Sequence, residues 1–316
     1  NGLNGSLEIG SAIYLHMKQS RFFLLIVCAF LCVNVASAAK WKAKHVVLIG
    51  LDGWGAYSVE KAEMPTVKKL MADGSYTLKK RSVLPSSSAV NWASMFMGAG
   101  PEIHGFTEWG SEKPELPSRE ISHYGLFPSV WGLFRDANPD AEMGYIYEWG
   151  GMKYLAEMQA MNKEVNIAPS ESNPRGCTDA VVSYIKESRP AFVGIIFEQP
   201  DGVGHGDGHD TPAYYTKLKE LDGYIGEIVK AVADAGMLDE TIFIVTADHG
   251  GINKGHGGKT MQEMETPFII SGKNVKKGYE FTESMMQFDV ASTIAYIFNL
   301  KQPQVWIGRP MKQVFK

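Results

Sequence analysis

The sequence predicts an α/β fold in which helices cover both faces of a largely parallel central sheet. Short apolar runs of strand length alternate along the chain with longer segments of helical periodicity. Several of these runs are continuously apolar, as is typical of strands buried on both faces. The 316 residues are 45% hydrophobic and 21% charged, which is ordinary for a globular protein. The net charge of −4 argues against a surface that binds a nucleic-acid polymer.

The first predicted strand and helix illustrate the two patterns. Residues 45–51 read HVVLIGL, a continuous apolar run that ends at Asp52-Gly53. Residues 64–74 carry Pro65 near the start and Gly74 at the end, which is the usual asymmetry of a helix. The same reasoning predicts the later elements, which are a helix at 128–137, a strand at 141–149, a helix at 177–188, a strand at 191–199, a helix at 214–236, strands at 241–247 and 266–272, and a helix at 288–300.

The N-terminal segment indicates that the protein is exported, and we do not expect it to be part of the folded domain. Residues 17–38 combine basic residues, an apolar stretch and Ala36-Ser37-Ala38, the pattern of a signal peptide with its cleavage site. Residues 1–16 read as an untranslated or dispensable leader, so we expect one mature domain at 39–316, periplasmic or secreted. The apolar stretch is short for a membrane span, so we expect no stable anchor; a retained anchor is the alternative.

The cysteine content indicates a mature domain that is stabilised by burial of its hydrophobic core rather than by disulfides. Cys28 and Cys32 lie within the predicted signal peptide, and neither follows a small residue as a lipoprotein site requires. The mature chain keeps only Cys177, so it can form no internal disulfide. We expect Cys177 to pack as a small hydrophobic residue.

Acidic residues follow three of the predicted buried strands. Asp52, Asp201 and Asp248 each lie just past the carboxyl end of a strand. Ligands of open α/β sheets bind at this edge, because the carboxyl ends of parallel strands meet there. The sequence therefore predicts that three strands deliver carboxylates to one site.

Histidines accompany two of these carboxylates. In EQPDGVGHGDGHD (198–210), glycines between Asp201 and His205 allow both side chains to converge, and His209 is a rival for the same role. In TADHGGINKGHGG (246–258), the glycines after His249 end the strand, so that adjacent Asp and His residues can turn toward one site.

Together the clusters supply three carboxylates and three imidazoles: Asp52, Asp201, His205, Asp248, His249 and His256. This is enough for two sites whose nitrogen and oxygen ligands suit Zn²⁺, and Mn²⁺ or iron could also bind such a set. Paired metal ions about 4 Å apart typically clamp a displacement at phosphorus. The reaction also requires a nucleophile, for which residues 84–105 (LPSSSAVNWASMFMGAGPEIHG) offer a serine run.

The order of these motifs resembles a known family. Asp-Gly after the first strand, then P-S-S-S-A-V-N, P-D-x-x-x-H, T-A-D-H-G and a later Gly-His are similar to the alkaline phosphatase superfamily, on its type I phosphodiesterase/nucleotide pyrophosphatase branch. The resemblance covers nearly the whole mature chain. It implies a three-layer sandwich, two divalent metal ions and a small phosphate-ester substrate.

The resemblance also assigns roles residue by residue. One metal ion would be held by Asp52, Asp248 and His249, and the other by Asp201, His205 and His256. Ser88 takes the position of the nucleophile, which the first metal ion would coordinate and which would form a phosphoseryl intermediate. Asn91 takes that of an asparagine contacting a phosphoryl oxygen. The neighbouring Ser86 and Ser87 remain alternatives. A position at a helix start suits the nucleophile, because N-terminal amides favour phosphate.

Substrate preference and rival activities complete the expectations. The superfamily's monoesterases add an arginine or a Lys-x-Arg pair where this chain has Tyr147-Glu148-Trp149 and then Lys153, which favours diesters or pyrophosphates. A phosphomonoesterase is the alternative, and a sulfatase, a phosphomutase or an inactive binding module are further ones. Trp54, Trp92 and Trp149 are candidates for stacking on a nucleoside or choline group, or for ordinary packing.

Overall fold

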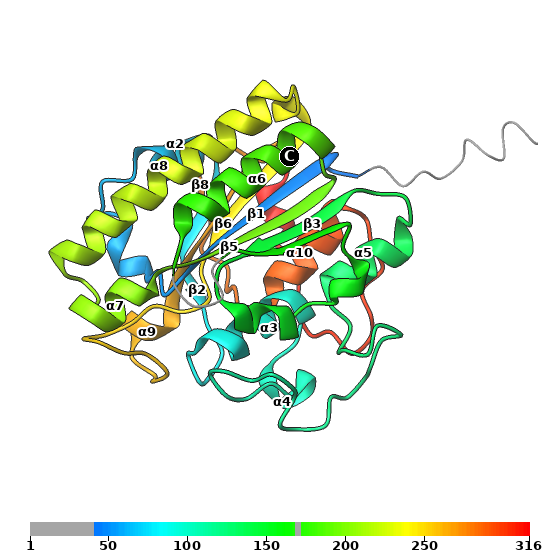
Figure 1. The fold of residues 1–316 in the computed structure, drawn as a ribbon, viewed down its shortest axis with the longest axis horizontal. Helices are drawn as coiled ribbons and strands as arrows, with labels where there is room; N and C mark the ends of the chain where they lie inside the picture. The colour runs from blue at the N-terminus through cyan, green and yellow to red at the C-terminus, as the bar shows by residue number, and fades with distance from the viewer. Residues whose placement is uncertain (1–40, 168–171) are drawn as a thin grey trace, which may run out of the picture. The chain divides into compact units, whose positions relative to one another are not determined.

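The computed structural model describes residues 41–167 and 172–316, and residues 41–316 form one compact unit (Figure 1). Its centre is an eight-stranded sheet with the order β4-β3-β5-β1-β6-β7-β2-β8. The strands are β1 (His45–Asp52), β2 (Gly74–Arg81), β3 (Met143–Tyr147), β4 (Lys163–Asn166), β5 (Phe192–Pro200), β6 (Thr241–Thr246), β7 (Glu265–Gly272) and β8 (Tyr279–Glu280). Strand β7 pairs antiparallel with both of its neighbours, and every other pairing is parallel.

Helices cover both faces of this sheet, as predicted. The α-helices are α2 (Pro65–Ala72), α3 (Ser88–Met97), α4 (Pro101–His104), α5 (Val130–Ala137), α6 (Pro174–Ser188), α7 (Asp201–Asp207), α8 (Pro212–Asp234), α9 (Met261–Met264) and α10 (Asp289–Ile297). Short 3₁₀ helices lie at Ala56–Ser58, Gly150–Tyr154, Met158–Ala160, Leu238–Glu240 and Lys312–Val314. Helices α2, α6 and α8 lie on one face, and α3, α5 and α10 lie on the other (Figure 1).

Strand β1 shows why the central strands are apolar throughout. Its side chains alternate between the two faces, so Val46 and Leu48 join the core beneath α3, α5 and α10. Val47, Ile49 and Leu51 join the second core beneath α2, α6 and α8. A strand with a hydrophobic core on each side must be apolar at every position, which is the pattern the sequence displays.

The structure adds elements that the sequence analysis did not predict. Strands β2, β4 and β8 were missed, because β2 carries lysines and arginine and the other two are short. The sequence analysis assigned no helix or strand to the segment after β5. It forms the short helix α7, and this places Asp201 and His205 one helical turn apart.

Two further expectations have different outcomes. Cys177 is buried in the core, as expected for a small packed residue. The predicted leader and signal peptide lie outside the described residues. Among residues 41–167 and 172–316, no helix has the length and apolar character needed to cross a membrane.

Candidate metal centre and nucleophile

The three strand-end carboxylates meet at one edge of the sheet. Asp52 ends β1, Asp201 directly follows β5, and Asp248 lies just past β6. These are three adjacent parallel strands at the middle of the sheet. All three carboxylates are buried, with at most 8% of each residue exposed. The predicted convergence of Asp52, Asp201 and Asp248 is therefore present.

One cluster gathers around the imidazole of His249. Its Nε2 lies 3.2 Å from Asp248 Oδ2, 3.4 Å from Asp52 Oδ1 and 3.1 Å from Ser88 Oγ. The Ser88 hydroxyl is also 3.3 Å from Asp52 Oδ1. The first turn of α3 thus brings the candidate nucleophile to the cluster that the family resemblance assigned to it.

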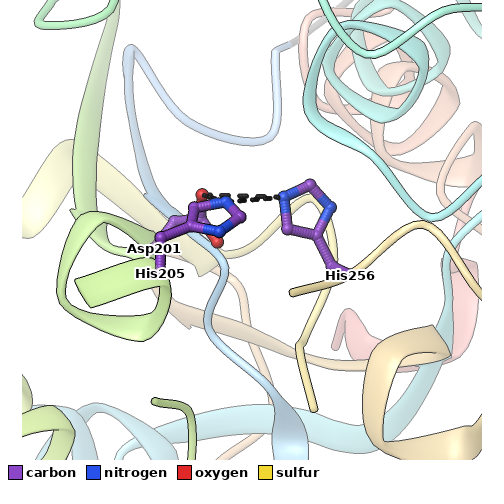
Figure 2. Close-up of side chains that lie close together, drawn as sticks. All are labelled: Asp201, His205 and His256. Carbon is purple, nitrogen blue, oxygen red and sulfur yellow. Dashed lines mark hydrogen bonds and ion pairs between the residues drawn. The ribbon is translucent and has the colours of Figure 1, made fainter. Parts of the chain in front are cut away.

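The second cluster joins α7 to the loop after β6. Figure 2 shows the His205 and His256 rings facing the Asp201 carboxylate. His205 Nε2 lies 3.1 Å from Asp201 Oδ2 and 3.1 Å from His256 Nε2, and His256 Nε2 lies 3.7 Å from Asp201 Oδ2. Asp201 also lies within 4.8 Å of candidate ligand atoms of Asp52 and His249. Asp201 is therefore the carboxylate that the two clusters share.

All three histidines are oriented by main-chain carbonyls. The Nδ1 atoms of His205, His249 and His256 lie 2.7–3.0 Å from the carbonyl oxygens of Lys254, Gly250 and Ser86. A carbonyl oxygen can only accept, so each Nδ1 carries the proton and each Nε2 presents its lone pair to the cluster in the neutral ring. This is the usual arrangement of metal-binding histidines.

The loop Asp52-Gly53 requires glycine at its second position. Gly53 has a φ of +71°, and a Cβ there would lie 2.6 Å from Asp201 Oδ1. Its main-chain N–H donates to Asp248 Oδ1 at 3.1 Å. Gly53 therefore permits the close approach of the β1 loop to Asp201 and orients Asp248 at the same time.

The electrostatics of the site favour bound cations. Burial raises the pKa of Asp52 well above its usual range, and raises the pKa of Asp248 to about 7. Burial also opposes the ionised form of Asp201, but hydrogen bonding from His205 and nearby imidazoles hold its pKa at about 2. The hydrogen bond to Asp201 raises the pKa of His205 to about 9. Facing carboxylates and imidazole lone pairs repel one another unless protons or cations lie between them.

Two buried oxygens provide a direct test of the metal hypothesis. Asp201 Oδ1 and Asp248 Oδ2 have no hydrogen-bond partner within residues 41–167 and 172–316. A buried carboxylate oxygen without a partner is costly, whereas coordination of a divalent cation would satisfy it. The Asp and His side chains present therefore fit the predicted type of site.

His209 lies behind this site rather than at its surface. Its side chain is fully buried, with Nε2 3.6 Å from Asp201 Oδ1, and neither ring nitrogen has a hydrogen-bond partner in the described part of the chain. His205, in contrast, belongs to the cluster with Asp201 and His256. The geometry thus favours His205 in the choice that the sequence left open.

The Asn91 amide is engaged with main-chain groups of the loop before α3. Its Oδ1 accepts from the Val83 N–H, and its Nδ2 donates to the carbonyls of Val83, Pro85 and Ser87. The side chain is fully buried. In this structure Asn91 holds the loop before α3 in place, and its amide has no group left for a phosphoryl oxygen.

The three tryptophans proposed for stacking have different environments. Trp54 and Trp92 are fully buried, so a stacking role for them is wrong. The Trp92 indole packs against Gly50 and donates to Asp52 Oδ2 at 3.0 Å. Trp149 is half-buried and stacks on Trp109, at 6.5 Å between ring centroids. Trp109 was missed because the 106–127 loop shows no readable motif.

A cavity of about 650 Å³ opens beside the second cluster. It is lined by Pro85, Ser87, Glu108, Trp109, His205, Gly255, His256 and Gly257. No lysine or arginine is among these residues. The cavity therefore offers the candidate metal site on one side and an aromatic and acidic wall on the other.

The sheet is largely parallel, and carboxylates and imidazoles cluster at the ends of its central strands beside a serine at the start of a helix. Together with the sequence match, these features place the protein in the alkaline phosphatase superfamily. Within it, the chain belongs to the type I phosphodiesterase/nucleotide pyrophosphatase family, whose sequence model matches residues 46–256. The expected superfamily and branch are confirmed.

Two relatives match about two thirds of the chain in sequence. Ectonucleotide pyrophosphatase/phosphodiesterase family member 1 of Rattus norvegicus is 24% identical over 223 residues, covering 67% of this chain and 24% of its own. Bis(5'-adenosyl)-triphosphatase ENPP4 of Bos taurus is 24% identical over 228 residues, covering 69% of this chain and 49% of its own. The chain thus spans less than half of the length of either relative.

Solved structures share the fold. Murine ectonucleotide pyrophosphatase/phosphodiesterase 5, in an inactive form in complex with AMP, superposes with a TM-score of 0.71 at 15% identity, covering 86% of this chain and all of that one. A 2-O GAG sulfatase superposes with a TM-score of 0.70 at 14% identity, covering 86% of this chain and 74% of that one. Phosphodiesterases and sulfatases both use this fold, so the fold alone does not decide the ester.

Proposed function

We propose that the protein is an exported, metal-dependent hydrolase of phosphodiester or pyrophosphate bonds, with Ser88 as the nucleophile. The observation that carries this is the position of the Ser88 hydroxyl, 3.1 Å from His249 and 3.3 Å from Asp52 at the edge of the carboxylate cluster. Family membership and the names of the relatives support the phosphodiester reading. The predicted signal peptide at 17–38 supports export to the periplasm or the medium.

Asp52, Asp248 and His249 would hold one divalent cation, and Asp201, His205 and His256 the other. Bound Zn²⁺ ions would supply a lowered pKa for the Ser88 hydroxyl and charge neutralisation at the phosphoryl oxygens. The Ser88 proton passes to solvent before attack. Ser88 Oγ then bonds to phosphorus as the bond to the departing oxygen breaks, and that oxygen takes a proton from water. Water attacks the phosphoseryl intermediate, releasing phosphate monoester and restoring Ser88.

Among the described residues, no lysine or arginine lines the cavity, and this supports a diester over a monoester substrate. A monoester dianion presents more charge than a diester, and the residues lining the cavity include no lysine or arginine to meet it. A sulfatase is a weaker candidate despite its shared fold. That class matures a Cys or Ser within C/S-x-P-x-R, and residues 86–90 read SSSAV.

The test is hydrolysis by the purified protein loaded with Zn²⁺, using bis-p-nitrophenyl phosphate, p-nitrophenyl phosphate and p-nitrophenyl sulfate. We expect the diester to have the highest kcat/KM. A Ser88→Ala variant should lose at least about a thousandfold in kcat while still binding metal, because the nucleophile is absent. Undiminished hydrolysis by Ser88→Ala would rule out Ser88 as the nucleophile, and a preference for the sulfate would identify a sulfatase.

A further inference from the structure

A glutamine in the core joins several segments of the chain next to the first cluster, which gathers around His249. Gln287 lies two residues before α10 and is fully buried. Its Nε2 lies 3.1 Å from the Asp248 carbonyl oxygen and 3.3 Å from the carbonyl oxygens of Ala247 and Asn91. The amide thus contacts both the segment just past β6, which carries a candidate metal ligand, and helix α3, which carries the candidate nucleophile.

The surroundings of Gln287 fix the orientation of its amide. The three carbonyl oxygens can only accept, so the amide atom that faces them is the Nε2 donor. On the other side, Oε1 accepts from the Lys80 side-chain nitrogen, which also donates to the Ala247 carbonyl at 2.8 Å. The Gln287 main-chain N–H donates to the Arg81 carbonyl at 2.9 Å. Strand β2 therefore holds both the backbone and the side chain of Gln287.

Ser82 contacts the same Asp248 carbonyl from the segment after β2. Its Oγ donates to that carbonyl at 2.6 Å, and the residue is fully buried. At the side-chain end, the Gly53 N–H donates to Asp248 Oδ1 at 3.1 Å, and Asp248 Oδ2 lies 3.2 Å from His249 Nε2. Groups that orient a metal-binding carboxylate contribute strongly to the affinity of its site. Ser82 and Gln287 place this carboxylate through its main-chain carbonyl.

The contact of this amide with Asn91 restrains helix α3. Asn91 lies about one helical turn after Ser88, so its carbonyl and the Ser88 side chain belong to one hydrogen-bonded helix and move together. Ser88 Oγ lies 3.1 Å from His249 Nε2. A small shift of α3 against Asp248 would change the geometry from which Ser88 attacks. An amide that contacts the Asp248 and Asn91 carbonyls at once therefore limits that shift.

Gln302 is a comparable amide with a structural role. Its Nε2 donates to Ser292 Oγ at 3.0 Å and to the Gly308 carbonyl at 3.2 Å. These partners lie on α10 and in the segment that follows it, and neither belongs to a candidate metal cluster. Gln302 therefore resembles Gln287 in chemistry but has partners outside the site.

We propose that Gln287 is a positioning residue that holds the first metal cluster and the nucleophile helix at a fixed distance from each other, and that Lys80 keeps its amide in the required orientation. Gln287 acts through the main chain of Asp248 and Asn91 rather than by contact with substrate. The inference rests on the proposed function for the role of Ser88, and it adds residues that no motif of the sequence marked.

Removal of the amide tests the effect on metal binding. Gln287→Met keeps most of the side-chain volume and removes both N–H donors. A His256→Ala background weakens the second cluster and retains the candidate ligands of the first. In that background we expect Gln287→Met to lower the Zn²⁺ affinity roughly tenfold, as is usual when a group that orients a ligand is lost. Competition with a chromophoric chelator measures the affinity. Gln302→Met is the matched control, and it should lower the Tm and leave the affinity unchanged.

Kinetics at saturating Zn²⁺ test the effect on the nucleophile. With bis-p-nitrophenyl phosphate, we expect Gln287→Met to lower kcat roughly ten- to a hundredfold and to leave KM within about twofold, because orientation of the nucleophile is lost and substrate binding is not. Ser82→Ala removes a donor to the Asp248 carbonyl but leaves the contact with α3. It should therefore weaken Zn²⁺ binding and keep kcat within about twofold. Lys80→Met should resemble Gln287→Met in both measurements, because the amide loses its orienting partner.

The proposed function and the role of Gln287 fail on different results. If the wild-type protein binds Zn²⁺ but hydrolyses no diester, the proposed function fails, and the Zn²⁺ affinities still decide the role of Gln287. Wild-type affinity in Gln287→Met overturns that role, as does an equal loss of affinity in Gln302→Met. An equal fall of kcat in Ser82→Ala and Gln287→Met overturns the coupling to α3. Should Gln287→Met fail to fold, wild-type affinity in both Ser82→Ala and Lys80→Met would overturn the proposal.

Discussion

His209 Nε2 and Asp201 Oδ1 face each other at 3.6 Å inside the protein, and neither atom has a hydrogen-bond partner in the described residues. The pair is tightly enclosed. A Cβ on Gly204 or Gly251 would lie 2.3 or 2.2 Å from the His209 ring. Because Asp201 belongs to both candidate metal clusters, His209 stands behind the carboxylate that joins them.

This arrangement predicts different consequences for the two histidines near Asp201. His205→Ala removes a candidate ligand and should weaken Zn²⁺ binding at the second cluster by more than roughly a hundredfold. His209→Ala removes only a neighbour of Asp201, and should weaken binding by roughly ten- to a hundredfold, as is usual for groups that orient a ligand. Competition with a chromophoric chelator measures both affinities. A larger loss in His209→Ala than in His205→Ala would reverse the assignment.

Metal binding should depend on pH through His205. Hydrogen bonding to Asp201 raises the pKa of His205 from 6.5 to about 9, so below pH 9 a proton occupies its Nε2 and competes with the metal ion. Zn²⁺ affinity should therefore rise as the pH increases from 7 to 9, with release of protons. Calorimetry in two buffers of different ionisation enthalpy counts those protons. His205→Ala should release fewer, and equal affinities at pH 7 and pH 9 would contradict the prediction.

The same pair affects the stability of the metal-free protein. The folded-state pKa of His205 is raised, so its contribution is fully present below pH 6.5 and is lost as the pH rises through 9. The pKa of Asp201 is lowered from 3.8 to about 2, so its contribution is present above pH 3.8 and is lost as the pH falls through 2. With a chelator present, the free energy of unfolding of the wild-type protein should exceed that of His205→Ala by an amount that shrinks above pH 9. Denaturant unfolding at pH 6 and pH 10 measures it.

Asn91 should prove to be a structural residue. Its amide makes four hydrogen bonds to the main chain of residues 83–87, so Asn91→Ala would leave buried polar groups unpaired. We expect the free energy of unfolding to fall by about 1–3 kcal/mol. Denaturant titration of the metal-free variant provides the measurement. An unchanged free energy of unfolding together with a selective loss of kcat/KM would instead support direct contact with substrate.

Trp92 should affect the metal affinity of the first cluster through its hydrogen bond to Asp52. Trp92→Phe keeps most of the ring volume but removes the donor to Asp52 Oδ2, so Zn²⁺ affinity should fall by roughly tenfold. Gly50→Ala tests the packing that positions this indole, because the added Cβ would lie 2.4 Å from the Trp92 ring. We expect that variant to lose about 1–3 kcal/mol of stability from overpacking. Wild-type metal affinity and Tm in both variants would show that the contact has no role.

Much of the fold could be predicted from the chain because hydrophobic burial repeats at regular intervals. The central strands β1, β5 and β6 have cores on both faces and are therefore apolar at nearly every position. Strand β2 was not predicted because its charged residues interrupt the apolar pattern of a buried strand. Its Lys80 is nevertheless buried, and the ammonium group is satisfied by partners distant in sequence, the Ala247 carbonyl and Gln287. Such a partner is invisible to local periodicity.

For the candidate site, the sequence by itself determined which groups reach the central edge of the sheet. Parallel strands end together, so Asp52, Asp201 and Asp248 had to meet there. Tertiary structure decided how the remaining polar groups are used. His205 lies in the cluster, and His209 lies behind it. The Asn91 amide binds the loop before α3, and Ser87 lines a cavity. Neighbouring residues of similar chemistry differ only in what surrounds them, and those surroundings come from distant parts of the chain.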